Sequence, residues 1–481
     1  MPDRRTHVTA SAAQSELAAA LAALRTGLDL PDGFPEPVER EAGAAAAGLV
    51  LPDADLTAVE FLTIDPEGST DLDQAMHIER AGDGFRVRYA IADVPALVRP
   101  DGAVDAEARR RGQTVYAVDG RIPLHPAAIG EHAGSLLAGV VRGAYVWDLV
   151  LDAQGRETSV SVARARIRSR RQWTYQEAQS AIDDGSAPGT LLLLATVGLA
   201  RIELERERGG ASLDAPDEEV VLREGGYTLE RRAPLPVEGW NAQLSLLTGM
   251  AAARLMLDAR VGILRTMPPP TDEAVAAFRA QSTALGLPWP EDVPYGEYLR
   301  CLDHSDPRAL AVMQAATGLF RGAGYVVMRG EAPADPLQSA VAAPYAHTTA
   351  PLRRLVDRWV LVICEALSAG AEVPGWALES LGELPSIMGA SSRLASRLNA
   401  ASVDRVEAAL LVDRVGDEFD ATVLSVRGDR MTVQLAEPSV VASCPRTDWE
   451  LPGAVVHLTL TAADIASGRL TFTTARDRTA E

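Results

Sequence analysis

Residues 64–74 read Ile-Asp-Pro-Glu-Gly-Ser-Thr-Asp-Leu-Asp-Gln, and the chain on either side of this stretch alternates between apolar and polar residues. Alternation over 59–64 predicts a strand that ends where the stretch begins. Two more strands are expected over 75–80 and 85–94, around a Gly-Asp-Gly turn. The stretch is therefore predicted to be a loop framed by sheet, and its polar residues should gather at one sheet edge.

Three aspartates, Asp65, Asp71 and Asp73, lie close together in this loop. If the second and third are extended, the two-residue period of a strand points both carboxylates to one face. Carboxylates gathered in this way repel one another unless their pKa values rise or a cation neutralises them. Oxygen ligands favour magnesium or manganese, and a phosphodiester substrate would complete the coordination. The alternative is that the aspartates are ordinary turn residues, and the loop alone does not decide between the two.

A second polar segment, residues 345–354, leads into apolar residues at helical spacing. Pro351 suits the first position of a helix, and the threonines at 348 and 349 are candidate caps. Arg353 and Arg354 would then lie in the first turn, where the helix dipole disfavours a cation. The segment therefore predicts an anion site built from helix N–H groups and guanidinium. The alternative is pairing with a carboxylate such as Asp357, which we expect for Arg354 more than for Arg353.

The whole chain has 481 residues, with 66 acidic and 46 basic side chains and a formal net charge of -20. Its 47% hydrophobic and 23% charged residues are typical of a globular protein, and its length suggests roughly three domains. No apolar run is long enough to cross a bilayer. The three cysteines form no close pair in the sequence, so neither a disulfide framework nor a thiolate zinc site is indicated. We expect a cytoplasmic protein that makes no contact with membranes.

Every one of the 46 basic residues is arginine, so no lysine is available for Schiff-base or P-loop chemistry. Because the acidic total repels nucleic acid in general, a polyanionic substrate would have to be held by local arginines or by metal ions. A row of arginines alternates along a strand predicted over 158–170: Arg164, Arg166, Arg168 and Arg170. This row fits either a track for successive phosphates or a solvated edge strand.

Leucine spacing near the N-terminus predicts a helix over 11–26, and a second helix is expected over 38–49. Residues 1–55 are therefore predicted to form a small helical module, either of the helix-turn-helix kind or a plain packing cap. Short strands at the other end predict a β-barrel of the OB type over 413–481. Helices and strands alternate irregularly over 56–412, so the expected fold class is α+β with a mixed sheet.

Several segments, in order from residue 64 to residue 354, resemble the ribonuclease II family, whose catalytic core is called the RNB domain. The matching segments are Ile64-Asp65-Pro66, Asp71-Leu72-Asp73-Gln74-Ala75, Ile91-Ala92-Asp93-Val94, Arg111–Tyr116, Arg121–Pro126, Trp173-Thr174-Tyr175 and Tyr345–Arg354. The resemblance implies an RNB catalytic domain over 56–412. It implies a magnesium-dependent enzyme, with manganese as the other suitable metal, that threads single-stranded RNA and hydrolyses it from the 3′ end to nucleoside 5′-monophosphates. It also implies a monomer with no obligate protein partner.

The resemblance assigns roles to single residues as well. It implies that the metal is bound by Asp65, Asp71, Asp73 and Gln74. It also implies that the catalytic residues are Asp73 and Arg353, of which Arg353 would offset charge on the phosphate. Contacts with RNA fall to Tyr116, Tyr175, Tyr345, His347 and Arg354. Among these, Tyr116 would stack on a base and Tyr175 would contact the terminal sugar. The alternatives are a tyrosine of the sheet core for Tyr116 and a structural histidine for His347.

The chain departs from the family pattern within these segments. Gln74 stands where the family has a fourth aspartate, and an uncharged amide oxygen binds a metal more weakly than a carboxylate. Ala350 stands where the family has a serine. These departures motivate an alternative function, a catalytically impaired RNA-binding protein. The short stretch before Asp65, too short for the family's two cold-shock barrels, motivates a third, a phosphodiesterase acting on DNA or small nucleotides.

Overall fold

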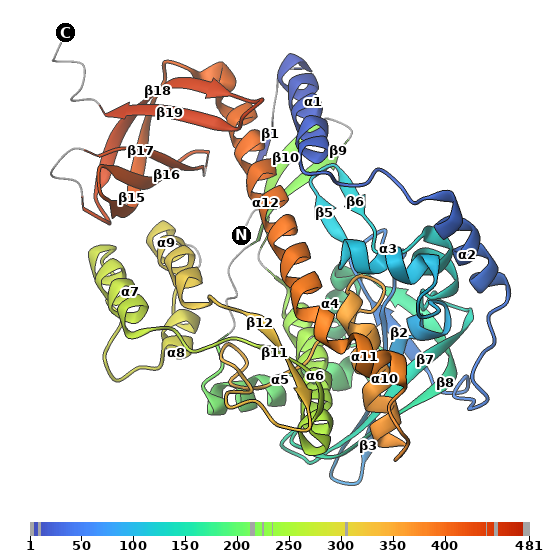
Figure 1. Cartoon of the computed structure of the whole chain (residues 1–481). Coiled ribbons are helices and arrows are strands. Elements are labelled where there is room, and N and C mark those ends of the chain that lie inside the picture. The colour runs from blue at the N-terminus through green and yellow to red at the C-terminus, as the bar shows by residue number, and fades with distance from the viewer. Residues whose placement is uncertain are drawn as a thin grey trace.

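The computed structural model describes residues 4–7, 11–211, 217–223, 226–232, 234–303, 306–438, 440–446 and 451–474. The larger part of the molecule contains a closed barrel of five strands, in the order β2-β3-β4-β7-β8 (Figure 1). These strands are β2 (Phe61–Ile64), β3 (Gln74–Ala81), β4 (Gly84–Ala92), β7 (Val141–Leu151) and β8 (Glu157–Trp173). Neighbouring strands are antiparallel except β2 and β8, which pair in parallel. The α+β class and the mixed sheet are therefore confirmed.

Helices and short hairpins occupy the connections of the barrel. Between β4 and β7 lie η1 (Val94–Ala96), α3 (Ala103–Arg111), the hairpin of β5 (Val115–Ala117) and β6 (Gly120–Ile122), and the π-helix η2 (Ala128–Ala133). After β8 come α4 (Tyr175–Asp183), α5 (Gly189–Arg208), β9 (Asp217–Arg223), β10 (Gly226–Arg232), α6 (Pro236–Ala259) and β11 (Val261–Thr266). Over the described ranges, no helix has both the length and the apolar surface that crossing a bilayer requires.

The chain then leaves the barrel and returns to it. It passes through α7 (Asp272–Ala284), α8 (Tyr295–Arg300), α9 (Pro307–Ala316), η3 (Thr317–Leu319), β12 (Gly324–Arg329), β13 (Leu337–Gln338) and β14 (Ala343–Pro344). Next come α10 (Leu355–Ser368), α11 (Gly375–Ser380), η4 (Leu381–Glu383), α12 (Leu384–Leu411) and η5 (Val412–Arg414). Strand β12 pairs with β11, so the helices α7, α8 and α9 form an insertion between two neighbouring strands.

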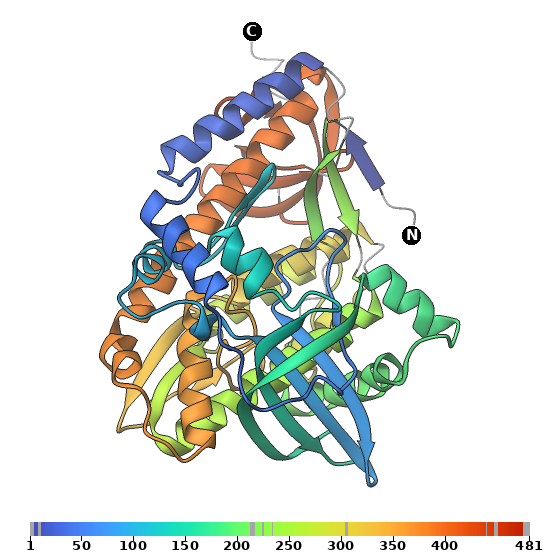
Figure 2. The same ribbon diagram turned by 90° about the vertical axis from the view of Figure 1, so that its right-hand side faces the viewer.

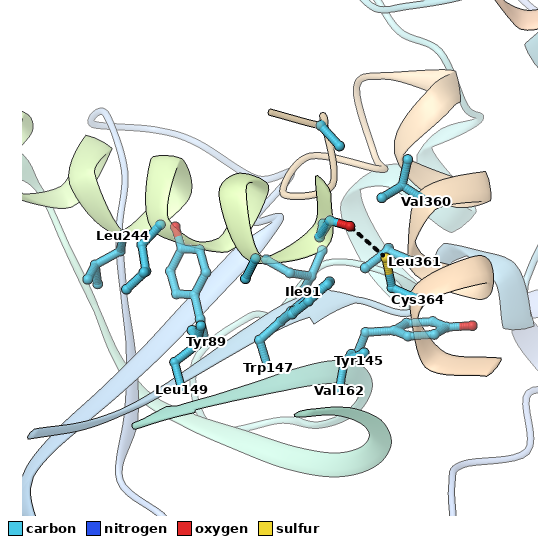
Figure 3. Packing of buried hydrophobic residues seen from close by; sticks show 14 of the residues in the cluster. Tyr89, Ile91, Tyr145, Trp147, Leu149, Val162, Leu244, Val360, Leu361 and Cys364 are labelled. Atoms are coloured by element: carbon cyan, nitrogen blue, oxygen red, sulfur yellow. Dashed lines mark hydrogen bonds between the residues drawn. The ribbon is translucent and has the colours of Figure 1, made fainter. Parts of the chain in front are cut away.

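Alternate residues of β4 enter two different cores, because successive side chains of a strand point to opposite faces. Tyr89 and Ile91 lie with Trp147 in a core that also takes in α5, α6 and α10 (Figure 3). Ala90 and Ala92 lie in a second core, which includes α3 and the second N-terminal helix. Alternate residues of the barrel strands thus pack into two separate cores, each of which includes helices.

The two N-terminal helices pack into separate parts of the molecule. Helix α1 (Ser11–Gly27) lies along α12, where Leu17 and Leu21 share a buried cluster with Val406 (Figures 1 and 2). Helix α2 (Glu36–Ala47) lies beside α3 and η2, and its Val38 enters the second core. The apolar faces of the two helices are therefore buried on different partners, and the grouping of residues 1–55 as one helical module stays a prediction. The strand β1 (Arg4–His7) pairs with β10.

A second, smaller β-domain lies at the far end of α12 (Figure 1). Its strands are β15 (Glu418–Arg427), β16 (Arg430–Leu435), β17 (Val441–Pro445), β18 (Val455–Asp464) and β19 (Arg469–Thr474). They form an antiparallel sheet in the order β17-β16-β15-β18-β19, and the edge strands β17 and β19 lie against each other. The sheet is therefore curled into a nearly closed barrel, as expected for the OB type. Residues 475–481 of the predicted domain lie outside the described residues.

Candidate active site

The loop after β2 begins with Asp65, whose backbone N–H donates to the carbonyl oxygen of Trp173 at 3.0 Å. The Oδ2 atom of Asp65 is buried and has no hydrogen-bond partner among the described residues. Burial raises the pKa of Asp65 to about 7, because a charge is poorly solvated there. Of the neighbouring charges, Arg353 lowers this pKa and Asp71 raises it. The buried carboxyl group of Asp65 would therefore be stabilised in its charged form by a nearby cation.

Asp73 lies at the other end of the loop, directly before β3, and is 4% exposed. Its Oδ1 accepts the backbone N–H of Leu352 at 2.8 Å, and its Oδ2 lies 3.3 Å from Nε of Arg353. Burial raises the pKa of this carboxyl to about 7, and the Arg353 guanidinium opposes the rise. The two residues predicted to be catalytic therefore lie together, although they are far apart in the sequence.

Asp71 is paired with a different cation. Its Oδ1 lies 2.5 Å from Nη1 of Arg121 on β6, and Nη2 of Arg121 contacts Thr70 Oγ1 and a Glu131 oxygen, both at 2.9 Å. Arg121 is not among the predicted site residues, although it belongs to one of the matching segments. In the part of the chain that the structure describes, no three His, Cys, Asp or Glu side chains are arranged to hold one metal ion. The expected gathering of three carboxylates is therefore incomplete, because an arginine holds one of them.

Helix α10 begins at Leu355, later than predicted. Arg354 precedes it in an extended conformation, with φ -131° and ψ 125°, and its backbone forms an isolated bridge with Gln113. The N–H groups of Arg353 and Arg354 both donate to the carbonyl oxygen of Ala350 in a turn. Pairing with a distant segment therefore replaces the expected first helical turn. Arg353 lies just ahead of the helix, and no side chain caps the helix start.

The guanidinium of Arg354 is engaged inside the protein. Its Nε and Nη2 donate to the two carboxylate oxygens of Asp357 at 3.0 and 2.8 Å. Asp357 is fully buried and also accepts the N–H of Ala350 at 2.7 Å. This is the pairing that the sequence left open as an alternative, so the geometry does not favour the RNA contact assigned to Arg354.

A groove of about 430 Å³ opens beside Arg353. Its lining comes from the β5 segment, the arginine segment and α12: Gln113, Thr114, Tyr116, Arg353, Arg354, Ala395, Ser396 and Asn399. Tyr116 is 54% exposed on β5, so the alternative of a sheet-core tyrosine is wrong. The predicted stacking residue and the predicted catalytic arginine therefore share one open groove, together with residues of α12 that the sequence analysis did not single out.

The other aromatic residues assigned to RNA are less accessible. Tyr175 is the first residue of α4 and is partly buried, and burial raises the pKa of its hydroxyl. Tyr345 is 8% exposed and packs edge-on against His347. His347 Nδ1 lies 2.7 Å from Oη of Tyr325, and burial lowers the pKa of this histidine. The structural alternative for His347 therefore fits the geometry better than an RNA contact, and the burial of Tyr345 does not favour the RNA contact assigned to it.

The arginines along β8 make contacts within the protein. Arg164 pairs with Asp93 at 2.6 Å, and Arg166 pairs with Asp55 at 3.1 Å. Arg170 donates to the carbonyl oxygen of residue 57. A row of guanidiniums that tracks successive phosphates is thus not favoured, because three of its four members, Arg164, Arg166 and Arg170, have partners within the protein.

Residues 53–369 match the family model described as the RNB domain, and residues 417–475 match the RNase II-type exonuclease C-terminal S1 domain. The chain is similar to ribonuclease R of Escherichia coli, with 26% identity over 457 residues, which are 86% of this chain and 54% of that protein. It is also similar to the exosome complex exonuclease dis3 of Schizosaccharomyces pombe, with 28% identity over 61% of this chain and 32% of that protein. The chain spans about half the length of the ribonuclease R relatives that it matches first.

Solved structures share the fold at low sequence identity. The Mycoplasma genitalium RNase R in complex with ribose methylated single-stranded RNA matches with a TM-score of 0.84 and 17% identity, over 95% of this chain and 78% of that chain. Yeast Ssd1, a pseudonuclease, matches with a TM-score of 0.65 and 15% identity, over 94% of this chain and 57% of that chain. The same fold therefore occurs in a ribonuclease and in a pseudonuclease, so the fold alone does not decide the activity.

Proposed function

The chain belongs to the RNB-domain family, and on that premise we propose that it is a 3′-to-5′ exoribonuclease. It hydrolyses single-stranded RNA to nucleoside 5′-monophosphates, and it acts in the cytoplasm without an obligate protein partner. The observation that carries this proposal is the pair of Arg353 and the buried Asp73, which stands at a groove that also exposes Tyr116. The similar RNase R of Mycoplasma genitalium has been solved in complex with ribose methylated single-stranded RNA, which supports the same class of substrate here.

The carboxylates of the loop fit magnesium by their chemistry, because magnesium prefers oxygen ligands. The observation that supports this is the Oδ2 atom of Asp65, which is buried and lacks a partner among the described residues. Asp65 and Asp73 would hold the ion, with Asp71 as the third predicted ligand, and manganese suits the same atoms. When bound, the metal would lower the pKa of an attacking water and stabilise the leaving oxygen.

The protein's own side chains bind and orient the RNA. The side chain of Arg353 is 46% exposed, so it can reach a phosphate in the groove and offset the charge that develops there. Asp73 pairs with this guanidinium from the buried side and holds its direction. Tyr116 stacks on a base without regard to its identity, and Tyr175 lies near Asp65, where it can contact the terminal sugar.

A second candidate function is RNA binding without turnover. Two observations favour it: Arg121 already neutralises Asp71, and the side chain of Gln74 is engaged by its neighbours. Both reduce the number of oxygen atoms that are available to a metal. The same fold in a pseudonuclease is consistent with this candidate.

The test is incubation of a 5′-labelled single-stranded RNA with the purified protein and magnesium, beside the variant Asp73→Asn. The exoribonuclease proposal predicts a descending ladder that ends in a short oligonucleotide and is lost in the variant. Internal fragments would contradict it. Intact RNA in both lanes, with RNA binding retained, would favour the second candidate. A deoxyribose oligonucleotide of the same sequence separates a ribonuclease from a phosphodiesterase that acts on DNA.

A further inference from the structure

The side-chain amide of Gln74 joins three separate elements of the fold. At the start of β3, its Nε2 donates to the carbonyl oxygen of Thr349 at 2.7 Å. Its Oε1 accepts the hydroxyl of Tyr89 on β4 and, at 3.5 Å, the hydroxyl of Ser245 on α6. The two hydroxyls lie 3.0 Å from each other. Figure 3 shows the Tyr89 side chain directed from β4 toward α6.

The orientation of the amide follows from its partners. A backbone carbonyl such as that of Thr349 can only accept a hydrogen bond, so the atom that faces it must be the NH₂ group of Gln74. The amide oxygen then faces the two hydroxyls, and both of its acceptor positions are used. A carboxylate at this position could not donate to Thr349, and it would bring another charge next to the buried Asp73.

Thr349 stands immediately before the turn from which Arg353 projects. That turn is held at Leu352, whose N–H donates to Asp73, and at Ala350, whose N–H donates to Asp357. Gln74 adds a third attachment, at the carbonyl of Thr349. Two consecutive residues, Asp73 and Gln74, therefore bind the same turn, one through an acceptor and the other through a donor.

We infer that Gln74 is a positioning residue that fixes the Arg353 turn and is not a metal ligand. The inference rests on the proposed function, in that Arg353 is the group that acts on the substrate. It revises the metal role that the family resemblance implied for this position. It also accounts for a glutamine in place of an aspartate, because only an amide can serve the Thr349 carbonyl and the two hydroxyls together.

The main test is the variant Gln74→Met, which keeps the length of the side chain and its lack of charge but removes both hydrogen-bonding groups. We expect kcat on single-stranded RNA to fall by roughly tenfold to a hundredfold, because a small displacement of the catalytic arginine is costly. We expect KM for RNA and the Kd for magnesium, measured by calorimetry, to stay close to the wild-type values. A magnesium Kd weaker by roughly tenfold or more would overturn the inference, because losing a metal ligand has an effect of that size.

A double-mutant cycle separates positioning from general destabilisation. In an Arg353→Ala background, Gln74→Met should cause no further loss of kcat, because the group that it positions is gone. Equal losses in both backgrounds would overturn the inference. The matched control is Gln281→Ala, which removes an amide-to-carbonyl hydrogen bond from Gln281 to Leu424, far from the groove, and should leave kcat unchanged.

Two further measurements keep the inference testable if the variant misfolds or the protein does not cleave RNA. The variant Gln74→Glu keeps the side-chain length but lacks the donor at neutral pH, so kcat should fall, and retained or raised kcat would overturn the inference. Hydrogen exchange of the metal-free protein needs no turnover. Faster exchange over 345–354 in Gln74→Met would support the inference even if the proposed function fails, and unchanged exchange would overturn it.

Discussion

Nε of Arg353 lies 3.3 Å from Oδ2 of Asp73, and the two side chains are 46% and 6% exposed. One member of the pair is fixed in the interior, and the other reaches the groove beside Tyr116. The carboxylate therefore directs the guanidinium, and the guanidinium limits the rise in the pKa of the carboxyl. A substitution of Asp73 should therefore alter the direction of the Arg353 guanidinium, and a substitution of Arg353 should alter the pKa of Asp73.

Replacing Arg353 by lysine tests whether a positive charge at this position is sufficient for RNA cleavage. Arg353→Lys keeps a cation near Asp73 but loses the planar fork that can hold two phosphate oxygens. We expect the single-turnover rate of RNA cleavage to fall by roughly a hundredfold, which is typical for losing one oriented donor in a transition state. The melting temperature should stay close to the wild-type value. A nearly unchanged rate would mean that the guanidinium geometry is not used.

Substitution of the neighbouring Arg354 should lower the stability of the protein and leave its RNA affinity nearly unchanged. Arg354→Ala leaves the fully buried Asp357 without its cationic partner, and an unpaired buried charge costs about 3 kcal/mol or more. We expect a loss of that size in the free energy of unfolding, measured by urea denaturation. RNA affinity of the remaining folded protein should change little. Arg354→Ala with normal stability but weakened RNA binding would restore the RNA contact that the sequence suggested.

The stability of the metal-free protein should depend on pH through Asp73. The pKa of Asp73 is about 7 in the folded protein, against 3.8 ordinarily. Between these two values the folded state binds a proton that the unfolded state has lost, so stability falls as pH rises from about 4 to about 7. The slope for this one group is at most about 1.4 kcal/mol per pH unit.

The variant Asp73→Asn removes this titrating carboxyl, so the difference in stability between the two proteins reports on Asp73. In the absence of metal, the asparagine variant should gain stability relative to the wild type as pH rises from about 4 to about 7. Thermal unfolding of both proteins in a chelating buffer at several pH values measures the difference. A difference that does not vary with pH would show that Asp73 titrates near its ordinary value.

Much of the local structure could be predicted because it depends on neighbours in the sequence. The alternation around residues 59–64 and 85–94 marks β2 and β4, and the proline-glycine break marks the loop between β2 and β3. The pairing of Asp73 with Arg353 could be anticipated only through the family resemblance, since no local pattern brings two segments so far apart into contact. Similarly, nothing local indicates that Arg121 reaches Asp71.

The errors have a common physical origin in long-range contacts. Pro351 is a good first residue for a helix, yet the backbone at Arg354 pairs with Gln113 and delays the start of α10. The leucines of α1 predict a helix correctly, but its partner is α12 from the other end of the chain. A distant segment overrides the local preference at the start of α10, and a distant helix supplies the packing partner of α1. Neither contact can be predicted from neighbouring residues, because both form only in the folded chain.

Tyr116 should bind RNA by stacking and not by its hydroxyl. It is 54% exposed on a short hairpin, and it lines the groove that holds Arg353, so its ring is open to a base. Tyr116→Ala should weaken the binding of a single-stranded RNA by roughly 1 to 3 kcal/mol, whatever the base composition. Tyr116→Phe keeps the ring and should bind like the wild type. Fluorescence anisotropy with a labelled oligonucleotide in a chelating buffer, which prevents metal-dependent cleavage, measures both. If the phenylalanine variant lost as much affinity as the alanine variant, the contact would be a hydrogen bond, and Tyr116 would not be a stacking platform.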